Sequence, residues 1–263
     1  MKVLFMTGSH PRHAYMARCI ESSGFLSALV IEKRESHIPK PDTNLDDQLK
    51  KTFNNHFNKR AISENSFFGD SKLPDTEILK VSKENLNSLL THDFIKSIKP
   101  DLIISYGVHM LDDKIINLSN YESWNIHGGL SPWYRGNITH FWPSYFLEPQ
   151  MTGMTVHELT QEIDHGDIVH QTLADLVPGD SLHDLSCRAV ISLGREINKL
   201  LHLFSDKKEI KKISHTTSGR IWTGKDWRPE HLKLIYEMFD DKIVDHYLSG
   251  SFIKRKPKIF KQF

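Results

Sequence analysis

The chain has 263 residues, of which 34 are basic and 33 are acidic, and its formal net charge is +1. This near-neutral balance argues against nucleic acid as a partner, because binding to a phosphate backbone requires an excess of basic residues on some face. No apolar run approaches the roughly 20 residues that span a bilayer, and the first residues turn polar too soon for a signal peptide. The two cysteines, Cys19 and Cys187, provide neither a disulfide framework nor a metal cage. We therefore expect a cytoplasmic protein with no membrane and no nucleic-acid partner.

The first part of the chain has the pattern of a parallel α/β sheet. A strand is predicted over residues 2–7, a helix over 12–22 and a second strand over 25–31. Strand, short turn, helix and strand in this order are typical of the opening of such a sheet. The stretch from about 35 to 75 is polar with few strand signals, and we interpret it as a helical insertion or a lid.

The same pattern resumes in the middle of the chain. Further strands are predicted over 77–81, 101–106, 123–126, 153–159 and 168–174, and helices over 84–98, 139–146 and 182–204. The last helix carries apolar residues at helical spacing. The fold class that follows is a Rossmann-like, mostly parallel sheet with helices on both faces.

Composition changes after residue 205, where a charged stretch begins. We predict a catalytic domain over 1–205 and a small, largely helical C-terminal extension over 206–263. Helices are expected near 229–239 and 240–248. The basic cluster at 254–258 is expected to be a solvated tail.

The loop after the first predicted strand contains Gly8, Ser9, Arg12 and His13. Backbone amides at a helix N-terminus attract phosphate, and Arg12 adds a positive charge. An ordinary strand-to-helix turn explains the same residues. The loop lacks the glycine spacing of dinucleotide binders, which argues against a nicotinamide oxidoreductase.

Asn125 and His127 lie at the end of a predicted central strand and precede Gly128 and Gly129. Residues i and i+2 of a strand point to the same face, so the amide and the imidazole converge on one volume. Ligands of open α/β sheets bind at the carboxyl ends of the strands. The paired glycines allow a substrate to approach the backbone closely.

His157 ends a later predicted strand, and Asp164 follows in a loop. A carboxylate at this place can reach an imidazole and hold its tautomer. A metal site made of His127, His157 and His165 is an alternative, but no spacing typical of metal ligands supports it, so we expect no metal.

Together these motifs resemble the formyltransferase family that uses 10-formyltetrahydrofolate. Its signature of Asn-x-His at a strand end, a Gly-rich stretch with Leu and Pro, and a later loop aspartate matches 125–127, 128–136 and Asp164. Ser131 stands where the family usually has a second leucine. The resemblance covers roughly residues 70–205 and implies the formyltransferase fold, with 10-formyltetrahydrofolate as the donor.

The resemblance implies catalytic roles for three residues. His127 would take a proton from the attacking amine or stabilise developing charge, Asn125 would donate a hydrogen bond to the oxyanion, and Asp164 would orient His127. The residues expected to contact the folate lie in two loops: Tyr106, Gly107, Val108, His109, Met110, Leu111, Thr160 and Ile163.

Among family members, the chain most resembles the sugar-nucleotide N-formyltransferases, which have the core and a modest C-terminal extension. The transfer-RNA enzyme carries a larger C-terminal barrel and a basic surface, and the purine enzyme carries a Gly-x-Gly-Ser-Asn loop. The implied acceptor is a nucleotide-linked dideoxy amino sugar, as in lipopolysaccharide or O-antigen biosynthesis. The residues expected to bind it are Gly8, Ser9, Arg12, His13, Gly128, Gly129, Arg135, Trp222 and Lys225.

Several alternatives remain open. Trp222 and Trp227 would contact the nucleotide in one interpretation and only anchor the extension in the other. The acceptor could be another small amine, such as a ribonucleotide or an amino-acid derivative. Two further hypotheses are a hydrolase that releases formate from the same folate and a binding module without activity. A homodimer is expected, because homodimers are the commonest assembly.

Overall fold

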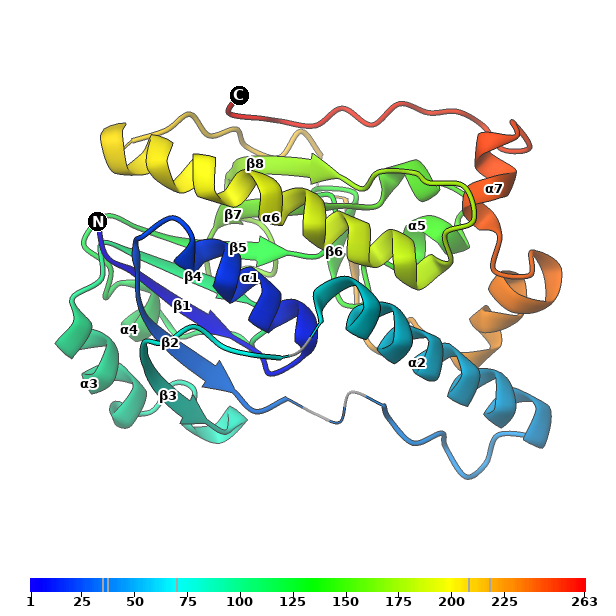
Figure 1. Cartoon of the computed structure of the whole chain (residues 1–263), viewed down its shortest axis with the longest axis horizontal. Coiled ribbons are helices and arrows are strands. Elements are labelled where there is room, and N and C mark those ends of the chain that lie inside the picture. The colour runs from blue at the N-terminus through cyan, green and yellow to red at the C-terminus, as the bar shows by residue number, and fades with distance from the viewer. Residues whose placement is uncertain (35, 37, 70, 208, 218) are drawn as a thin grey trace.

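The computed structural model describes residues 1–34, 36, 38–69, 71–207, 209–217 and 219–263. At its centre is a seven-stranded sheet in the order β3-β2-β1-β4-β5-β7-β8 (Figure 1). Five neighbouring strands are parallel: β1 (Val3–Thr7), β2 (Leu26–Glu32), β3 (Glu77–Val81), β4 (Leu102–Tyr106) and β5 (Glu122–His127). The next two, β7 (Gly153–Glu158) and β8 (Ile168–Leu173), each run antiparallel to the preceding strand. The predicted mostly parallel sheet is therefore confirmed.

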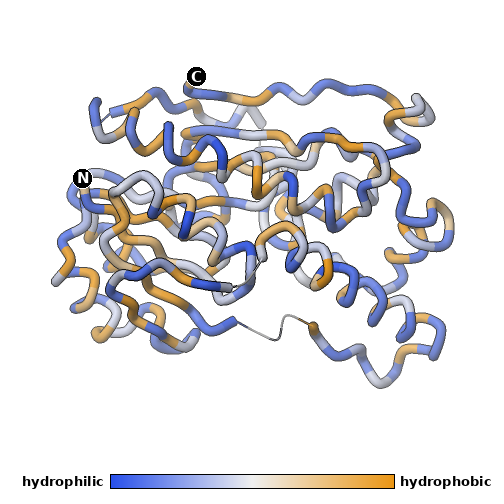
Figure 2. The backbone as a smooth tube through the Cα atoms, viewed as in Figure 1, coloured by the Kyte–Doolittle hydropathy of each residue, from blue (hydrophilic) through white to orange (hydrophobic). Residues whose placement is uncertain are grey.

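Helices cover both faces of this sheet. Alternating residues of β1 point to opposite sides: Val3 and Phe5 join the cluster under α1 (Pro11–Glu21) and α6 (Leu182–Lys207). Leu4 and Met6 join the cluster under α3 (Leu89–Ile98) and α4 (Asp113–Ile116). Figure 2 shows hydrophobic residues running along the inner strands of the sheet, and β1 and β4 are buried over their whole length.

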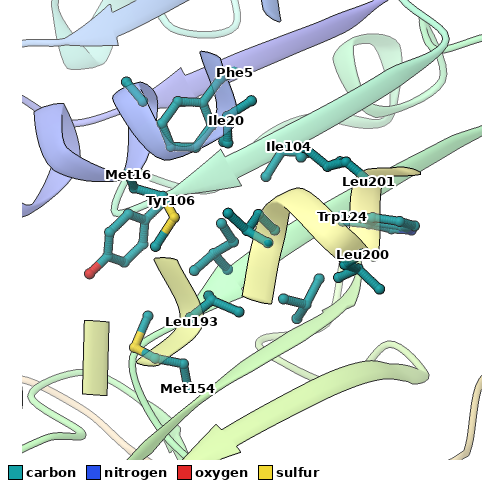
Figure 3. Packing of buried hydrophobic residues seen from close by; sticks show 14 of the residues in the cluster. Phe5, Met16, Ile20, Ile104, Tyr106, Trp124, Met154, Leu193, Leu200 and Leu201 are labelled. Atoms are coloured by element: carbon teal, nitrogen blue, oxygen red, sulfur yellow. The ribbon is translucent and has the colours of Figure 1, made fainter. Parts of the chain in front are cut away.

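Helix α6 closes the larger of the two clusters. Figure 3 shows Leu193, Leu200 and Leu201 of this helix packed with Trp124 of β5 and Met154 of β7. All five side chains are fully buried. Burial of each large apolar side chain contributes roughly 1.5–3 kcal/mol, so this contact fixes α6 on the sheet.

The polar stretch expected to be helical contains α2 (Asp47–Phe68), a helix of 22 residues. Asp46 caps its N-terminus by accepting a hydrogen bond from the Leu49 amide at 2.7 Å. The helix packs against α1, α6 and the short η3 (Pro229–His231), burying Phe53 and Phe68. It also buries His56 and Glu64, so that polar side chains lie on its inner face.

Several expected helices are shorter than predicted, and of the segment 139–146 only α5 (Trp142–Tyr145) is helical. The segment 84–98 divides into η1 (Lys83–Asn85) and α3, because Asn87 turns its side chain toward the Met110 carbonyl and the Asp112 amide. In the C-terminal extension, the positive φ angles of Asp240 and Asp241 separate η4 (Leu234–Met238) from α7 (Ile243–Leu248). The extension is thus less helical than expected.

The C-terminal extension is joined to the core by strand pairing and by aromatic stacking. Its strand β9 (Arg220–Trp222) pairs with β6 (Tyr134–Gly136), and Trp222 stacks on Trp142 of α5 (Trp142–Tyr145) with ring centroids 4.3 Å apart. Ile213 bridges to Ile168 of β8. The remaining short helix of the core is η2 (Pro149–Met151).

The end of the chain runs along β8 (Figure 1). The Gln171 amide donates to the Phe260 carbonyl at 2.8 Å, so the outer strand of the sheet is covered. The basic residues Lys254, Arg255 and Lys256 are exposed as expected, but the tail beyond them is docked on the sheet. None of the helices in the described ranges combines the length and apolar character that a membrane crossing requires.

We expect Leu193→Ala to lower the free energy of unfolding by about 2–5 kcal/mol, because it leaves a cavity between α6 and the sheet. Urea unfolding measures the change. Leu89→Ala is the matched control, since Leu89 is 80% exposed on α3. An equal loss in both variants would contradict this account of the core.

Candidate active site

The strand ends bring Asn125, His127 and His157 to one place. Asn125 and His127 alternate with inward-facing Ile126 on β5, and Asn125 lies opposite His157 of the antiparallel neighbour β7. The Asn125 Nδ2 atom lies 3.1 Å from His157 Nε2. The register thus brings a second imidazole, that of His157, to the Asn125 amide, a contact that the sequence analysis did not predict.

Asp164 lies at the centre of this group. Its Oδ2 accepts a hydrogen bond from the Gly136 amide at 2.7 Å and lies 3.3 Å from His127 Nδ1. Its Oδ1 lies 3.3 Å from both Asn125 Nδ2 and His157 Nε2. The backbone of Asp164 has a φ of 45°, a conformation that side-chain-bearing residues rarely adopt.

Arg135 holds the loop that carries this aspartate. Its guanidinium is buried and donates two hydrogen bonds to the Ile163 carbonyl, at 2.6 and 3.2 Å. Because Ile163 directly precedes Asp164, these bonds fix the backbone on which the carboxylate depends. Arg135 therefore acts on the position of Asp164.

A chain of hydrogen bonds fixes the direction of the Asn125 amide. The Ser105 hydroxyl donates to Asn125 Oδ1 at 2.7 Å, so the oxygen of the amide points toward Ser105. His157 Nδ1 lies 2.7 Å from the Glu158 carbonyl, which can only accept, so Nδ1 carries the hydrogen. His157 Nε2 then accepts from Asn125 Nδ2. The N–H side of the amide consequently faces Asp164 and the cavity.

The contacts of His127 identify the nitrogen that can exchange a proton. Its Nε2 lies 2.7 Å from the Tyr134 carbonyl, and therefore donates to it. Burial lowers the pKa of His127 below 6.5, although the Asp164 carboxylate and the Tyr134 carbonyl act in the opposite direction. Near neutral pH, Nδ1 is thus unprotonated and faces Asp164.

Asp164 stays ionised in the same environment. Burial alone would raise its pKa, but His127, His157 and the Gly136 amide together hold the pKa well below its ordinary value of 3.8. A proton that arrives at His127 Nδ1 is therefore held between the imidazole and a carboxylate. This arrangement suits general base catalysis.

Gly129, two residues after His127, leaves no room for a side chain. A Cβ atom on Gly129 would lie 2.6 Å from His127 Nε2 and 2.5 Å from the Tyr134 carbonyl oxygen. Any larger residue would break the bond that sets the tautomer of His127. Glycine at position 129 thus preserves the hydrogen bond between His127 and the Tyr134 carbonyl.

A cavity of about 960 Å³ opens over these residues. One wall is the loop after β4 together with the loop around Asp164, and the other is formed by α2 and the start of α6. A volume of this size is at the upper end of the usual range for small-molecule sites. Among the described residues, no group of three His, Cys, Asp or Glu is placed to hold a metal ion.

A family model described as "Formyl transferase" matches residues 38–192 of the chain. The chain belongs to the formyl transferase family. It is 34% identical over 137 residues to the bifunctional polymyxin resistance protein ArnA of Wigglesworthia glossinidia brevipalpis. That match covers 51% of this chain and 20% of ArnA, so this formyl transferase aligns with about a fifth of that relative's length.

Solved structures show the same fold at low identity. Phosphoribosylglycinamide formyltransferase from Anaplasma phagocytophilum is 16% identical, with a TM-score of 0.56 over 85% of this chain and 97% of that one. The formyltransferase PseJ from Anoxybacillus kamchatkensis is 18% identical, with a TM-score of 0.52 over 92% of this chain and 95% of that one. The PseJ structure is a complex with UDP-4,6-dideoxy-4-formamido-L-AltNAc and tetrahydrofolate. The predicted formyltransferase fold is thereby confirmed.

All eight residues expected to contact the folate line the cavity of this formyl transferase. The apolar side chains of Met110 and Ile163 are 56% and 43% exposed there, which fits a flat, partly apolar ring. The loop behind them is held in place, since Glu32 accepts from the His109 amide at 2.8 Å and Gln161 donates to the Leu111 carbonyl at 3.2 Å. The residues present therefore fit a folate.

The residues expected to bind the acceptor are divided by the structure. Arg12, His13 and Gly128 line the large cavity, whereas Gly8 and Ser9 line a separate cavity of about 390 Å³. The other four line neither: Gly129, Arg135, Trp222 and Lys225. Trp222 is buried against Trp142, with the Arg220 guanidinium 3.9 Å above its ring, and Lys225 is exposed. Trp227 lines the cavity instead.

His13 is wedged between two loops of the formyl transferase. Its ring is buried and meets Tyr106 edge-on, with centroids 4.9 Å apart. A Cβ atom on Gly8 or on Gly107 would overlap the ring from either side. Gly107 also has a φ of +66°, so a side chain there would be strained as well.

Sequence reasoning missed the contribution of α2. His56, Phe57, Arg60 and Glu64 of this helix all line the cavity, as do His140 and His183. The spacing of four residues between His56, Arg60 and Glu64 places them on one helix face, and this was the available signal. Their distance in sequence from β5 hid the connection.

We expect Ser105→Ala to lower kcat about 3- to 10-fold with little change in the KM of either substrate, because the Asn125 amide loses the bond that sets its direction. Steady-state formyl transfer measures this. Ser105→Thr keeps the hydroxyl and should restore kcat.

Ser123→Ala is the matched control for this test. Ser123 lies on the same sheet, on β5, and donates to the Ile116 carbonyl at 2.6 Å, away from the amide. A Ser105→Ala variant with unchanged kcat would refute the orienting role.

The buried histidines make stability depend on pH. Burial lowers the pKa of His56 to about 3 and that of His140 to about 4. Both lie below the unfolded value of about 6.5, so the unfolded chain binds more protons as the pH falls below 6.5. Each histidine makes its whole contribution to the free energy of unfolding above pH 6.5. That contribution decreases as the pH drops toward the folded pKa, by up to about 1.4 kcal/mol per pH unit for each histidine.

His140→Gln should therefore reduce the slope of unfolding free energy against pH by up to about one such increment between pH 6.5 and 4. Urea unfolding at several pH values measures the slope. His202→Gln, which changes an exposed ring, is the control. If the slope is the same in the His140 variant, the His140 ring takes up its proton in the folded protein as readily as in the unfolded chain.

Proposed function

We propose that the protein transfers a formyl group from 10-formyltetrahydrofolate to the primary amine of a nucleotide-linked dideoxy amino sugar. The observation that carries the formyl transfer is the arrangement of Asn125, His127 and Asp164 at one end of the sheet, facing one cavity. The donor supplies the formyl carbon, and the residues that would hold it are those of the loop after β4 and the loop before Asp164.

Asn125 has the role of an electrostatic catalyst in this proposal. One N–H of its amide donates to His157, and the other faces Asp164 and the cavity, where a formyl oxygen that gains negative charge can accept a hydrogen bond from it. Loss of such a donor typically lowers kcat about 100- to 1000-fold.

His127 and Asp164 manage the proton. A bond forms between the acceptor nitrogen and the formyl carbon, and the bond from that carbon to the donor nitrogen breaks. The acceptor nitrogen loses one proton and the donor nitrogen gains one, so no net proton is consumed. His127 Nδ1 is the base that can receive the proton, and the Asp164 carboxylate stabilises the resulting imidazolium.

The sugar-nucleotide acceptor rests on two considerations. The cavity is large enough for a second substrate beside the folate, and it extends past His127 toward Arg12 and α2. A relative of the same fold, PseJ, is bound to a UDP-linked formamido sugar and tetrahydrofolate. The phosphoribosylglycinamide formyltransferases share the fold as well, so an amine on a ribonucleotide is the alternative acceptor to test.

A turnover assay tests this function. The protein is incubated with 10-formyltetrahydrofolate and, separately, UDP- and dTDP-linked amino sugars with the amine at C3 or C4, and with a ribonucleotide amine. We expect one nucleotide-linked sugar to gain the mass of one carbonyl group, as seen by mass spectrometry. His127→Ala and Asn125→Ala should each lower this rate at least about 100-fold.

Omission of every amine is the control for hydrolysis. Formate release that is as fast without acceptor as with it would identify a hydrolase and overturn the proposal. Formylation of the ribonucleotide amine alone would keep the transfer chemistry and replace the acceptor.

A further inference from the structure

The α2 side of the cavity contains a cluster of charged residues that the chemistry above does not use. It comprises Arg12 from the first turn of α1 and Arg60 and Glu64 from α2. We refer to these three residues as the arginine cluster. They belong to two helices that are far apart in sequence but packed together.

Arg12 and Glu64 form an ion pair at the cavity wall. Arg12 Nη1 lies 2.6 Å from Glu64 Oε1, and the Glu64 side chain is only 6% exposed. The carboxylate thus holds one guanidinium in a fixed place. Arg12 also interacts electrostatically with Tyr106, the last residue of β4.

Arg60 supplies the second positive charge. Its guanidinium lies over the Phe57 ring, 4.8 Å from the ring centre, so the stacked group is held flat against the wall. Burial, followed by the charge of Arg12, lowers the pKa of Arg60 to about 10, which leaves it protonated at neutral pH. The guanidinium groups of Arg12 and Arg60 therefore belong to the same wall of the cavity.

The cluster and the catalytic residues line the same cavity. Arg12, Arg60 and Glu64 line it together with His127 and His140. A molecule whose amine meets His127 and whose other end is anionic can thus reach both groups. An amino sugar linked through C1 to phosphate has this form, because an amine at C3 or C4 lies across the ring from the phosphate.

We propose that Arg12 and Arg60, held by Glu64 and Phe57, are the subsite that binds the phosphate groups of the acceptor. This proposal rests on the proposed transfer to a phosphorylated amine. Guanidinium groups present paired donors that match phosphate oxygens, and two of them line this wall of the cavity. The subsite combines Arg12, which the sequence analysis placed in a phosphate-binding loop, with Arg60 of α2, which it did not name.

Calorimetric titration tests the subsite without requiring turnover. UDP, dTDP and inorganic pyrophosphate are titrated separately into the wild-type protein and into Arg60→Met. We expect at least one of the nucleoside diphosphates to bind the wild type, and Arg60→Met to weaken that binding about 10- to 100-fold. Arg60→Lys keeps the charge but loses the paired donors, and should fall between the two.

Steady-state kinetics separates a binding role from a structural one. In Arg60→Met the KM for the acceptor should rise by the same factor, while the KM for the folate donor stays within about twofold. Arg195→Met is the matched control, because Arg195 is an exposed arginine on α6 that pairs with Asp175. If Arg60→Met does not fold, as judged by circular dichroism, Arg12→Gln takes its place in both measurements.

The outcomes distinguish this subsite from the proposed acceptor. Formylation of the ribonucleotide amine with an Arg60-dependent KM would support the subsite and replace the sugar. Formylation of the nucleotide-linked sugar with an acceptor KM unchanged in Arg60→Met would overturn the subsite and leave the function intact. No binding of any of the three phosphates to the wild type would also overturn it.

Discussion

One carboxylate determines the geometry of the candidate active site. Asp164 accepts a hydrogen bond from the Gly136 amide. One of its carboxylate oxygens lies near Asn125 and His157, and the other faces His127. Its backbone adopts a positive φ, and the two bonds from Arg135 to the preceding carbonyl stabilise that conformation. Without this charge, two buried imidazoles and an amide would have no common partner, and the base would lose the group that stabilises its protonated form.

The convergence of Asn125 and His127 on one volume could be predicted from the sequence because their relation is local. Asn125 and His127 are two residues apart on one strand, and strand geometry alone places them on one face. The wall formed by α2 could not be predicted in this way, since its contact with the cavity depends on packing against α6 and η3. A polar helix taken in isolation has the composition of a solvent-exposed segment, whereas here Arg60 and Glu64 face the cavity.

Trp222 shows why aromatic residues near arginine were ambiguous. In sequence, Arg220 and Trp222 have the composition of a nucleotide-binding segment, and the alternative was a packing anchor. The stacking of Trp222 on Trp142 and the pairing of β9 with β6 place this ring in a core that joins the extension to the catalytic part. The two interpretations can be distinguished only by the stacking partner of Trp222. That partner, Trp142, lies some eighty positions earlier in the chain, and no local sequence pattern indicates the contact.

The wedge formed by His13 has a consequence for how such a site can change over evolutionary time. Gly8, His13 and Gly107 occupy one small volume, and neither glycine can gain a side chain while the imidazole is present. A lineage that places a larger residue at position 8 or 107 must first place a smaller one at position 13. The intermediate sequence then has an unfilled cavity beside Tyr106. These three positions are therefore expected to vary together across descendants, as a single inherited unit, although they come from the loop after β1, from α1 and from the loop after β4.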